Sequence, residues 1–230
     1  MAGPATGRWL LLLACLLPAL AEADARDEQA VMSSRAFLVA HPDLRFRTEG
    51  FLRLDEGKPE EARKDFLKAA RYADKPAQAM LAEMAWKGLG QEVDRALAYA
   101  WADIAAERGY PQLVALREAY WAQMDAEERQ RAVEVGMPLL QEYGDHAAKP
   151  RLALQLRRAR QGMISKRPRK DVTVQVPGPN GQPITLYGHD FYAEHFWNPE
   201  RYQEWVDETW QAPGSGTVEV GRLEQASDKP

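Results

Sequence analysis

Apolar side chains recur every three or four residues through much of this chain, which is the spacing of a single buried helix face. The clearest case lies between residues 77 and 85, where the apolar positions follow the order i, i+3, i+4, i+7 and i+8. These positions are Ala77, Met80, Leu81, Met84 and Ala85. The pattern predicts an amphipathic helix that packs against other helices.

A second helix is predicted directly after this one. Gly88 and Gly90 favour a tight turn between the two, and Asp94 is suited to cap the start of the second helix. Its expected buried positions are mostly small: Leu97, Ala98, Trp101, Ala102, Ala105 and Ala106. Gly109 and Pro111 end it. Residues 77–110 are therefore predicted to form a helical hairpin whose small side chains allow close helix packing.

The same spacing occurs earlier in the chain. Alanines at positions 62, 69 and 70 recur 36 positions later as Ala98, Ala105 and Ala106. The first three alanines lie in segment 43–76, which is also predicted to form a hairpin. A third, irregular hairpin is predicted over 112–145. A period of this length indicates stacked helical repeats, which commonly present a surface to a partner.

The residues that carry this repeat resemble the Sel-one-like repeat family, a tetratricopeptide-like α/α repeat. The positions concerned are Ala77, Leu81, Gly88, Gly90, Asp94, Ala98, Trp101, Ala105, Ala106 and Gly109. The resemblance covers 77–110 well, 43–76 partly and 112–145 poorly. It implies a right-handed superhelix of stacked hairpins that acts as an adaptor, often in exported bacterial proteins, and the family has no common catalytic residues to transfer.

Residues 1–21 have the features of a secretory signal peptide. An apolar run from Trp9 to Leu17 follows Arg8, and Ala19-Leu20-Ala21 fits a cleavage site. This predicts a periplasmic protein; acylation at Cys15, as in a lipoprotein, is the less favoured alternative. Because Cys15 is the only cysteine, the rest of the chain can form no disulfide. The net charge of −4 argues against nucleic acid as a general partner.

Composition and pattern divide the chain after residue 21 into four parts. A repeat domain is expected over 27–145, a basic helix or linker over 146–170, a small α+β region over 171–224 and a disordered tail over 225–230. The basic segment carries nine lysines and arginines and no acid from Lys149 to Lys170. It either docks on the acidic C-terminal region or binds anionic envelope components, with Arg157 and Arg158 as candidate contacts.

Aromatic and polar side chains gather between residues 187 and 210. Tyr187, Tyr192 and Trp197 are candidates for stacking on a glycan such as peptidoglycan, although the same rings are needed as core. Four residues resemble a metal or acid–base site: His189, Asp190, Glu194 and His195. On a helix the two histidines would lie about 240° apart, which disfavours shared ligation.

The sequence thus predicts a mainly α, α/α-repeat solenoid with a small C-terminal α+β appendage. The expected function is that of a non-catalytic, exported adaptor that binds unidentified protein partners without a cofactor. The alternatives are a glycan-binding module and, less favoured, a metal-dependent hydrolase.

Overall fold

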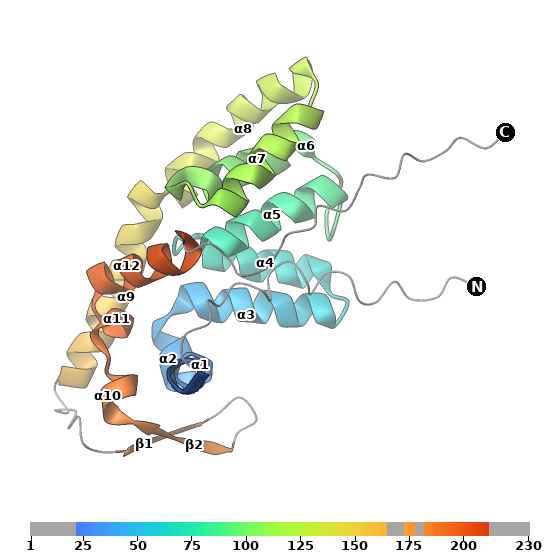
Figure 1. Cartoon of the computed structure of the whole chain (residues 1–230). Helices are drawn as coiled ribbons and strands as arrows, with labels where there is room; N and C mark the ends of the chain where they lie inside the picture. The colour runs from blue at the N-terminus through green and yellow to red at the C-terminus, as the bar shows by residue number, and fades with distance from the viewer. Residues whose placement is uncertain (1–21, 165–172, 178–181, 212–230) are drawn as a thin grey trace, which may run out of the picture.

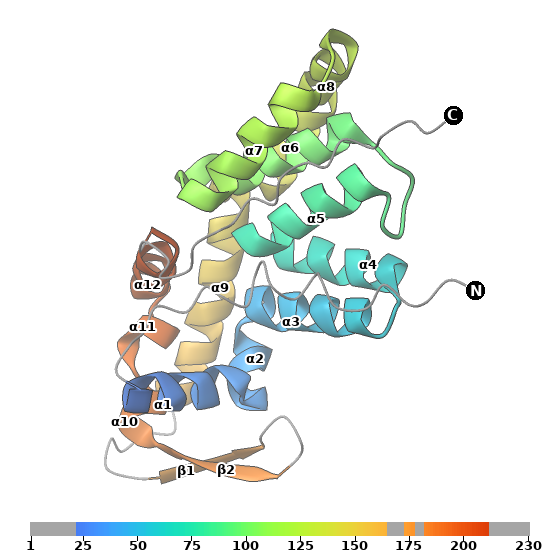
Figure 2. The same cartoon turned by 45° about the vertical axis from the view of Figure 1, so that its right-hand side comes forward.

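The computed structural model describes residues 22–164, 173–177 and 182–211, and most of these are helical (Figure 1). Helices α3 (Pro42–Asp55) and α4 (Pro59–Ala70) form the first hairpin, and α5 (Lys75–Lys87) and α6 (Arg95–Ala105) form the second. The hairpins stack one on another, with α4 against α5, as Figures 1 and 2 show. The α/α-repeat solenoid predicted from the sequence is confirmed.

The second hairpin follows the sequence closely. The α5 helix ends at Gly88, whose φ of 70° is in the left-handed region that favours glycine. The α6 helix begins after Asp94, whose side chain accepts a hydrogen bond of 3.0 Å from the backbone N–H of Leu97. Asp74 caps α5 in the same way, accepting from the N–H of Ala77 at 2.7 Å.

The core between the hairpins is built around small side chains. Its fully buried alanines come from both hairpins, and large apolar groups fill the space between them. They include Ala62, Ala69, Ala70, Ala77, Ala85, Ala98 and Ala102, with Phe66, Leu81, Met84 and Trp101 as the larger members. The repeat-motif alanines and Trp101 therefore lie inside the stack, where they pack helix against helix.

The third pair of helices departs from the expected hairpin. Helices α7 (Pro111–Gln123) and α8 (Ala126–Tyr143) both pack on α6, and α8 runs along α6 rather than along α7. A Cβ at Gly136 would make an ordinary van der Waals contact of 3.7 Å with that of Ala100, so α8 lies against α6 at this point. A capping box begins α8, because Asp125 and Glu128 each accept a hydrogen bond from the other's backbone N–H.

The basic segment of the sequence belongs, as far as the structure describes it, to α9 (Asp145–Ile164). This helix follows α8 and crosses the ends of the repeat helices (Figure 2). Leu152 and Leu156 are its buried anchors, while Arg157 and Arg158 stay exposed.

Before α3 the chain forms two helices, α1 (Glu22–Ser33) and α2 (Arg35–Ala40). Ser34 separates them because its side chain caps α2, accepting from the N–H of Phe37 at 3.3 Å. Pro42 then begins α3, as its fixed φ favours at a first helical position.

The C-terminal region contains a strand pair and helices, so the small α+β appendage predicted from the sequence is confirmed. Strands β1 (Thr173–Pro177) and β2 (Pro183–Tyr187) are antiparallel, with Val174 opposite Leu186. Two short helices, α10 (Gly188–Phe191) and α11 (Glu194–Trp197), lead into α12 (Pro199–Gln211). The side chain of Asn198 caps α12, as the sequence indicates. The tail expected over 225–230 lies outside the described residues.

Helices α1 and α2 share one hydrophobic cluster with the C-terminal region. Val31 and Phe37 from the N-terminal helices pack against buried residues of the C-terminal region, namely Leu186, Phe191, Phe196 and Trp197. The rings of Phe37 and Phe196 meet edge to face at 5.2 Å. The C-terminal region is thus packed on the start of the chain as well as on α9.

Candidate functional site

The four residues that suggested a metal site are not brought together. His189 Nε2 lies 3.2 Å from Asp190, whereas His195 Nε2 faces Glu28 of α1 at 3.6 Å. Glu194 is exposed. Within residues 22–164, 173–177 and 182–211, no group of three or more His, Cys, Asp or Glu side chains is arranged to hold a metal ion.

The aromatic residues divide between core and surface. Trp197 is 3% exposed, and its indole N–H donates to the backbone carbonyl of Phe191 at 2.5 Å. The prediction that Trp197 lines a ligand surface is therefore wrong, because α1 and α2 cover this part of the C-terminal region. Tyr187 is 58% exposed and stacks on His189 at 5.5 Å, and Tyr192 is half-buried.

The basic residues singled out from α9 have different surroundings. Arg157 forms an ion pair of 3.1 Å with Glu200 at the start of α12. Arg158 is exposed. At Arg157, then, the basic helix meets the acidic C-terminal region. Both partners are largely exposed, so we expect this pair to contribute little to stability.

A buried polar cluster joins α3 to α11 and α12. The ring nitrogens of His41 lie 2.9 Å from the carbonyl of Phe37 and 2.7 Å from that of Phe196. Burial lowers the pKa of His41 to about 4, so the ring is neutral at pH 7 and donates to one of the two carbonyls. Nearby, the hydroxyl of Tyr202 donates to Asp43 at 2.5 Å, and burial raises the pKa of that carboxyl.

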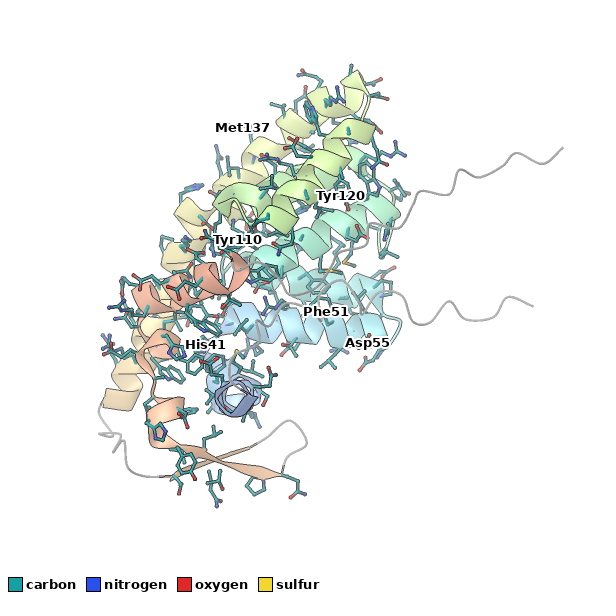
Figure 3. All side chains as sticks on the ribbon, viewed as in Figure 1. His41, Phe51, Asp55, Tyr110, Tyr120 and Met137 are labelled. Atoms are coloured by element: carbon teal, nitrogen blue, oxygen red, sulfur yellow. The ribbon has the colours of Figure 1, made fainter. Side chains whose placement is uncertain are left out.

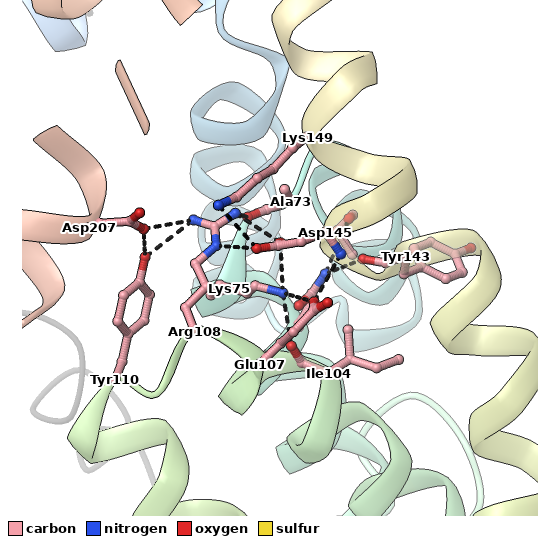
Figure 4. A network of polar contacts seen from close by, with 12 residues as sticks. Ala73, Lys75, Ile104, Glu107, Arg108, Tyr110, Tyr143, Asp145, Lys149 and Asp207 are labelled. Atoms are coloured by element: carbon pink, nitrogen blue, oxygen red, sulfur yellow. Dashed lines mark hydrogen bonds and ion pairs between the residues drawn. The ribbon is translucent and has the colours of Figure 1, made fainter. Parts of the chain in front are cut away.

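A second buried network joins α5, the end of α6, α9 and α12 (Figure 4). Lys75 is 1% exposed, and its ammonium donates to the carbonyl of Ile104 at 2.9 Å and pairs with Glu107 and Asp145 at 2.9 and 3.0 Å. Arg108 makes a two-pronged contact with Asp145, at 2.7 and 3.0 Å.

Basic and acidic side chains are paired in this network, and their pairing lowers the pKa of Asp145 at its centre. Burial acts to raise the pKa of Asp145, but the hydrogen bonds and charges of Arg108 and Lys75 outweigh it. They hold the pKa well below its usual value. The sequence offered no signal for this network, because its central residues lie at least 33 positions apart along the chain. They are Lys75, Arg108 and Asp145.

An exposed apolar stripe lies on α8. Val133, Met137 and Leu140 are 59%, 56% and 38% exposed, and their i, i+4, i+7 spacing places them on one face of the helix. Figure 3 shows Met137 on the outer side of α8. Apolar residues at this spacing usually form the buried face of a helix. In α8, however, a different face, with Ala132, turns toward α6 and its neighbours.

The α8 stripe (Val133, Met137 and Leu140) is the feature of the described surface most suited to a protein partner. Single exposed apolar residues such as Leu52 on α3, 56% exposed, are common on any protein surface. Three in one line on the last helix of a stack are less common, because an end helix usually presents a polar outer face.

No family model matches the chain, and no curated protein matches it. Among solved structures, the chain is similar to c5321, a protective antigen present in uropathogenic Escherichia coli strains and displaying an SLR fold. The two share 25% identity with a TM-score of 0.41, and the match covers 46% of this chain and 24% of that one. The repeat fold described above rests on the packing of the chain's own helices.

Proposed function

We propose that this chain is an exported, non-catalytic adaptor that binds a protein partner through the α8 stripe. The observation that carries the proposal is the line of three exposed apolar side chains on the last repeat helix. Because each side chain is already partly buried, covering its exposed part would contribute about 0.6–1.8 kcal/mol. A helix of the partner, laid along α8, is the simplest occupant of such a face.

The rest of the candidate chemistry supports binding over catalysis. The residues that carry the repeat motif pack against one another in the stack, and the polar side chains near His189 and His195 are held apart. The buried Lys75 and Arg108 form ion pairs with Asp145 that link helices of the fold.

Site-specific photo-crosslinking tests the stripe. A photoreactive amino acid is placed at Met137 in one variant and at Leu52 in another, since both positions are 56% exposed. We expect a discrete crosslinked partner in native cell envelope for position 137 and none for 52. Adding Val133→Glu to the 137 variant should abolish the adduct, because a charge would have to be desolvated at the contact.

The same experiment refutes the proposal under two outcomes. Equal crosslinking from positions 137 and 52 would show that the stripe has no special role. An adduct that survives Val133→Glu would show that the apolar line does not bind the partner.

Export is the second part of the proposal, and it depends on the signal-like pattern of residues 1–21. None of the helices in the described part of the chain is long and apolar enough to span a membrane. Mass spectrometry of the protein isolated from cells decides the point: we expect a chain that starts near Glu22. A full-length chain would refute export by cleavage, and a lipid-modified start at Cys15 would make the protein membrane-anchored instead.

A further inference from the structure

The last turns of α12 lie on the repeat helices, far from the α8 stripe in sequence. Trp210 is 9% exposed and its ring stacks on that of Tyr110, with centroids 5.8 Å apart and planes 21° apart. Val206 packs against the same cluster. The surface beneath these side chains is formed by residues of α5, α6 and α7 and their connections: Ala79, Ala105, Ala106, Tyr110 and Leu113. Because the three alanines are small, a helix can approach the stack closely here.

A polar contact accompanies the apolar one (Figure 4). The carboxylate of Asp207 accepts a hydrogen bond from the hydroxyl of Tyr110, and Nη1 of Arg108 lies 3.4 Å from it. Asp207 and Trp210 are three residues apart, so both side chains point from the same face of α12. The repeat surface thus binds a carboxylate and an indole ring together.

The groups that bind Asp207 are held in place without it. Arg108 donates to both carboxylate oxygens of Asp145 and to the carbonyl of Ala73 at 3.2 Å. Its Nη1 also donates to the hydroxyl of Tyr110 at 3.2 Å. Removing α12 would leave this arrangement intact, so the surface is organised in advance for an acidic, aromatic ligand.

The start of α12 is anchored independently of its end. Tyr202, fully buried, anchors the first half of the helix to Asp43. The main packing partners of α12 are α11 and α9, not the repeat helices. The last turns carry Asp207 and Glu208 and no basic residue, and acids at this end oppose the helix dipole. If the last turns left the repeats, Tyr202 would keep the helix attached.

We propose that the surface around Arg108, Tyr110 and Leu113 is a peptide-binding site that the end of α12 occupies within the same chain. Its partner is a protein segment, helical when bound, with an Asp or Glu three positions before a Trp. The site is separate from the α8 stripe and does not depend on it. Occupation by α12 makes binding conditional, because a partner must first displace Asp207 and Trp210.

The test uses the full chain and a fluorescein-labelled peptide, Tyr202–Gln211 of this sequence. One form of the chain is unmodified, and the other carries Asp207→Lys with Trp210→Ala, so that its own α12 no longer fills the site. The control is a peptide with the same two changes. Fluorescence anisotropy measures binding, and circular dichroism with thermal melting verifies that each variant is folded. Should the double variant not fold, Trp210→Ala alone takes its place.

We expect the folded variant to bind the natural peptide at least tenfold more tightly than the control peptide. The unmodified chain should bind it at least tenfold more weakly than the variant, because its attached α12 competes at an effective concentration of about millimolar. A folded variant that does not distinguish the two peptides overturns the peptide site. Equal binding by the variant and the unmodified chain overturns occupation by α12.

Discussion

The turn at Gly90 offers the sharpest test of how the two repeats are packed. Its φ of 65° is in the left-handed region, and a Cβ added there would lie 2.6 Å from the backbone N of Glu60 and the backbone C of Pro59. These atoms begin α4 in the preceding repeat and cannot rotate away. Gly90→Ala therefore combines backbone strain of about 1–2 kcal/mol with a clash against fixed backbone, about 1–3 kcal/mol.

Gly57 is the matched control for this substitution. Its φ is 72°, but a Cβ there would meet nothing within 4 Å. Gly57→Ala should thus show the backbone strain alone, about 1–2 kcal/mol. The difference between the two variants isolates the contact between the turn of the second hairpin and the start of α4.

Urea unfolding followed by circular dichroism measures both variants. The combined loss of about 2–5 kcal/mol for Gly90→Ala corresponds to a Tm lower by roughly 4–20 °C in a thermal melt, against about 2–8 °C for Gly57→Ala. If the two variants are equally destabilised, the close approach of the two repeats at Gly90 is not present in solution and the packing argument fails.

Three further predictions concern buried groups. Asp145→Asn should lower the free energy of unfolding in urea by about 3 kcal/mol at pH 7, because it leaves the buried Lys75 and Arg108 with one carboxylate fewer. Since the pKa of Asp145 is depressed, the difference between the two proteins should shrink as pH falls below about 4; a difference that stays constant would contradict the ion pairs of Asp145. Burial raises the pKa of Asp74 to about 6, although the charge of Arg47 acts to lower it. The native protein should therefore gain stability relative to Asp74→Asn, which retains the helix cap, as pH falls from 7 to 4. Parallel profiles of unfolding free energy against pH would refute this. Ala105→Leu should lower stability by about 1–3 kcal/mol through overpacking at a fully buried position, and an unchanged urea midpoint would count against the helix contact there.

The regular part of the fold could be predicted because its signals are local. The helix caps at Asp94 and Asp125, the left-handed end of α5 at Gly88 and the alanine positions of the stack depend on residues within a few positions of each other. A sequence pattern records such relations directly. The same holds for the C-terminal strand pair and for the cap at Asn198.

The helical spacing of apolar residues in α8 does not by itself identify the buried face. Periodicity identifies an apolar face but not the helix that covers it, and α8 has apolar or small residues on more than one side. Ala132 is buried and Val133 is exposed, although both fit a helical repeat. The packing of α8 on α6, a contact between segments distant in the sequence, decides which face turns inward.

The junctions between distant segments could not be predicted at all, and His41 shows why. Beside Pro42 it reads as a turn residue, and it does end α2. Its ring, however, stacks on Phe37 at 3.7 Å and reaches the carbonyl of Phe196, 155 positions away. A buried imidazole must find polar partners or lose stability, but this requirement does not say where in the chain the partner lies. The same reasoning applies to Arg108 and Asp207: their pairing, on which the peptide-site proposal depends, is set by how α12 returns to the repeats, and only the folded chain reveals it.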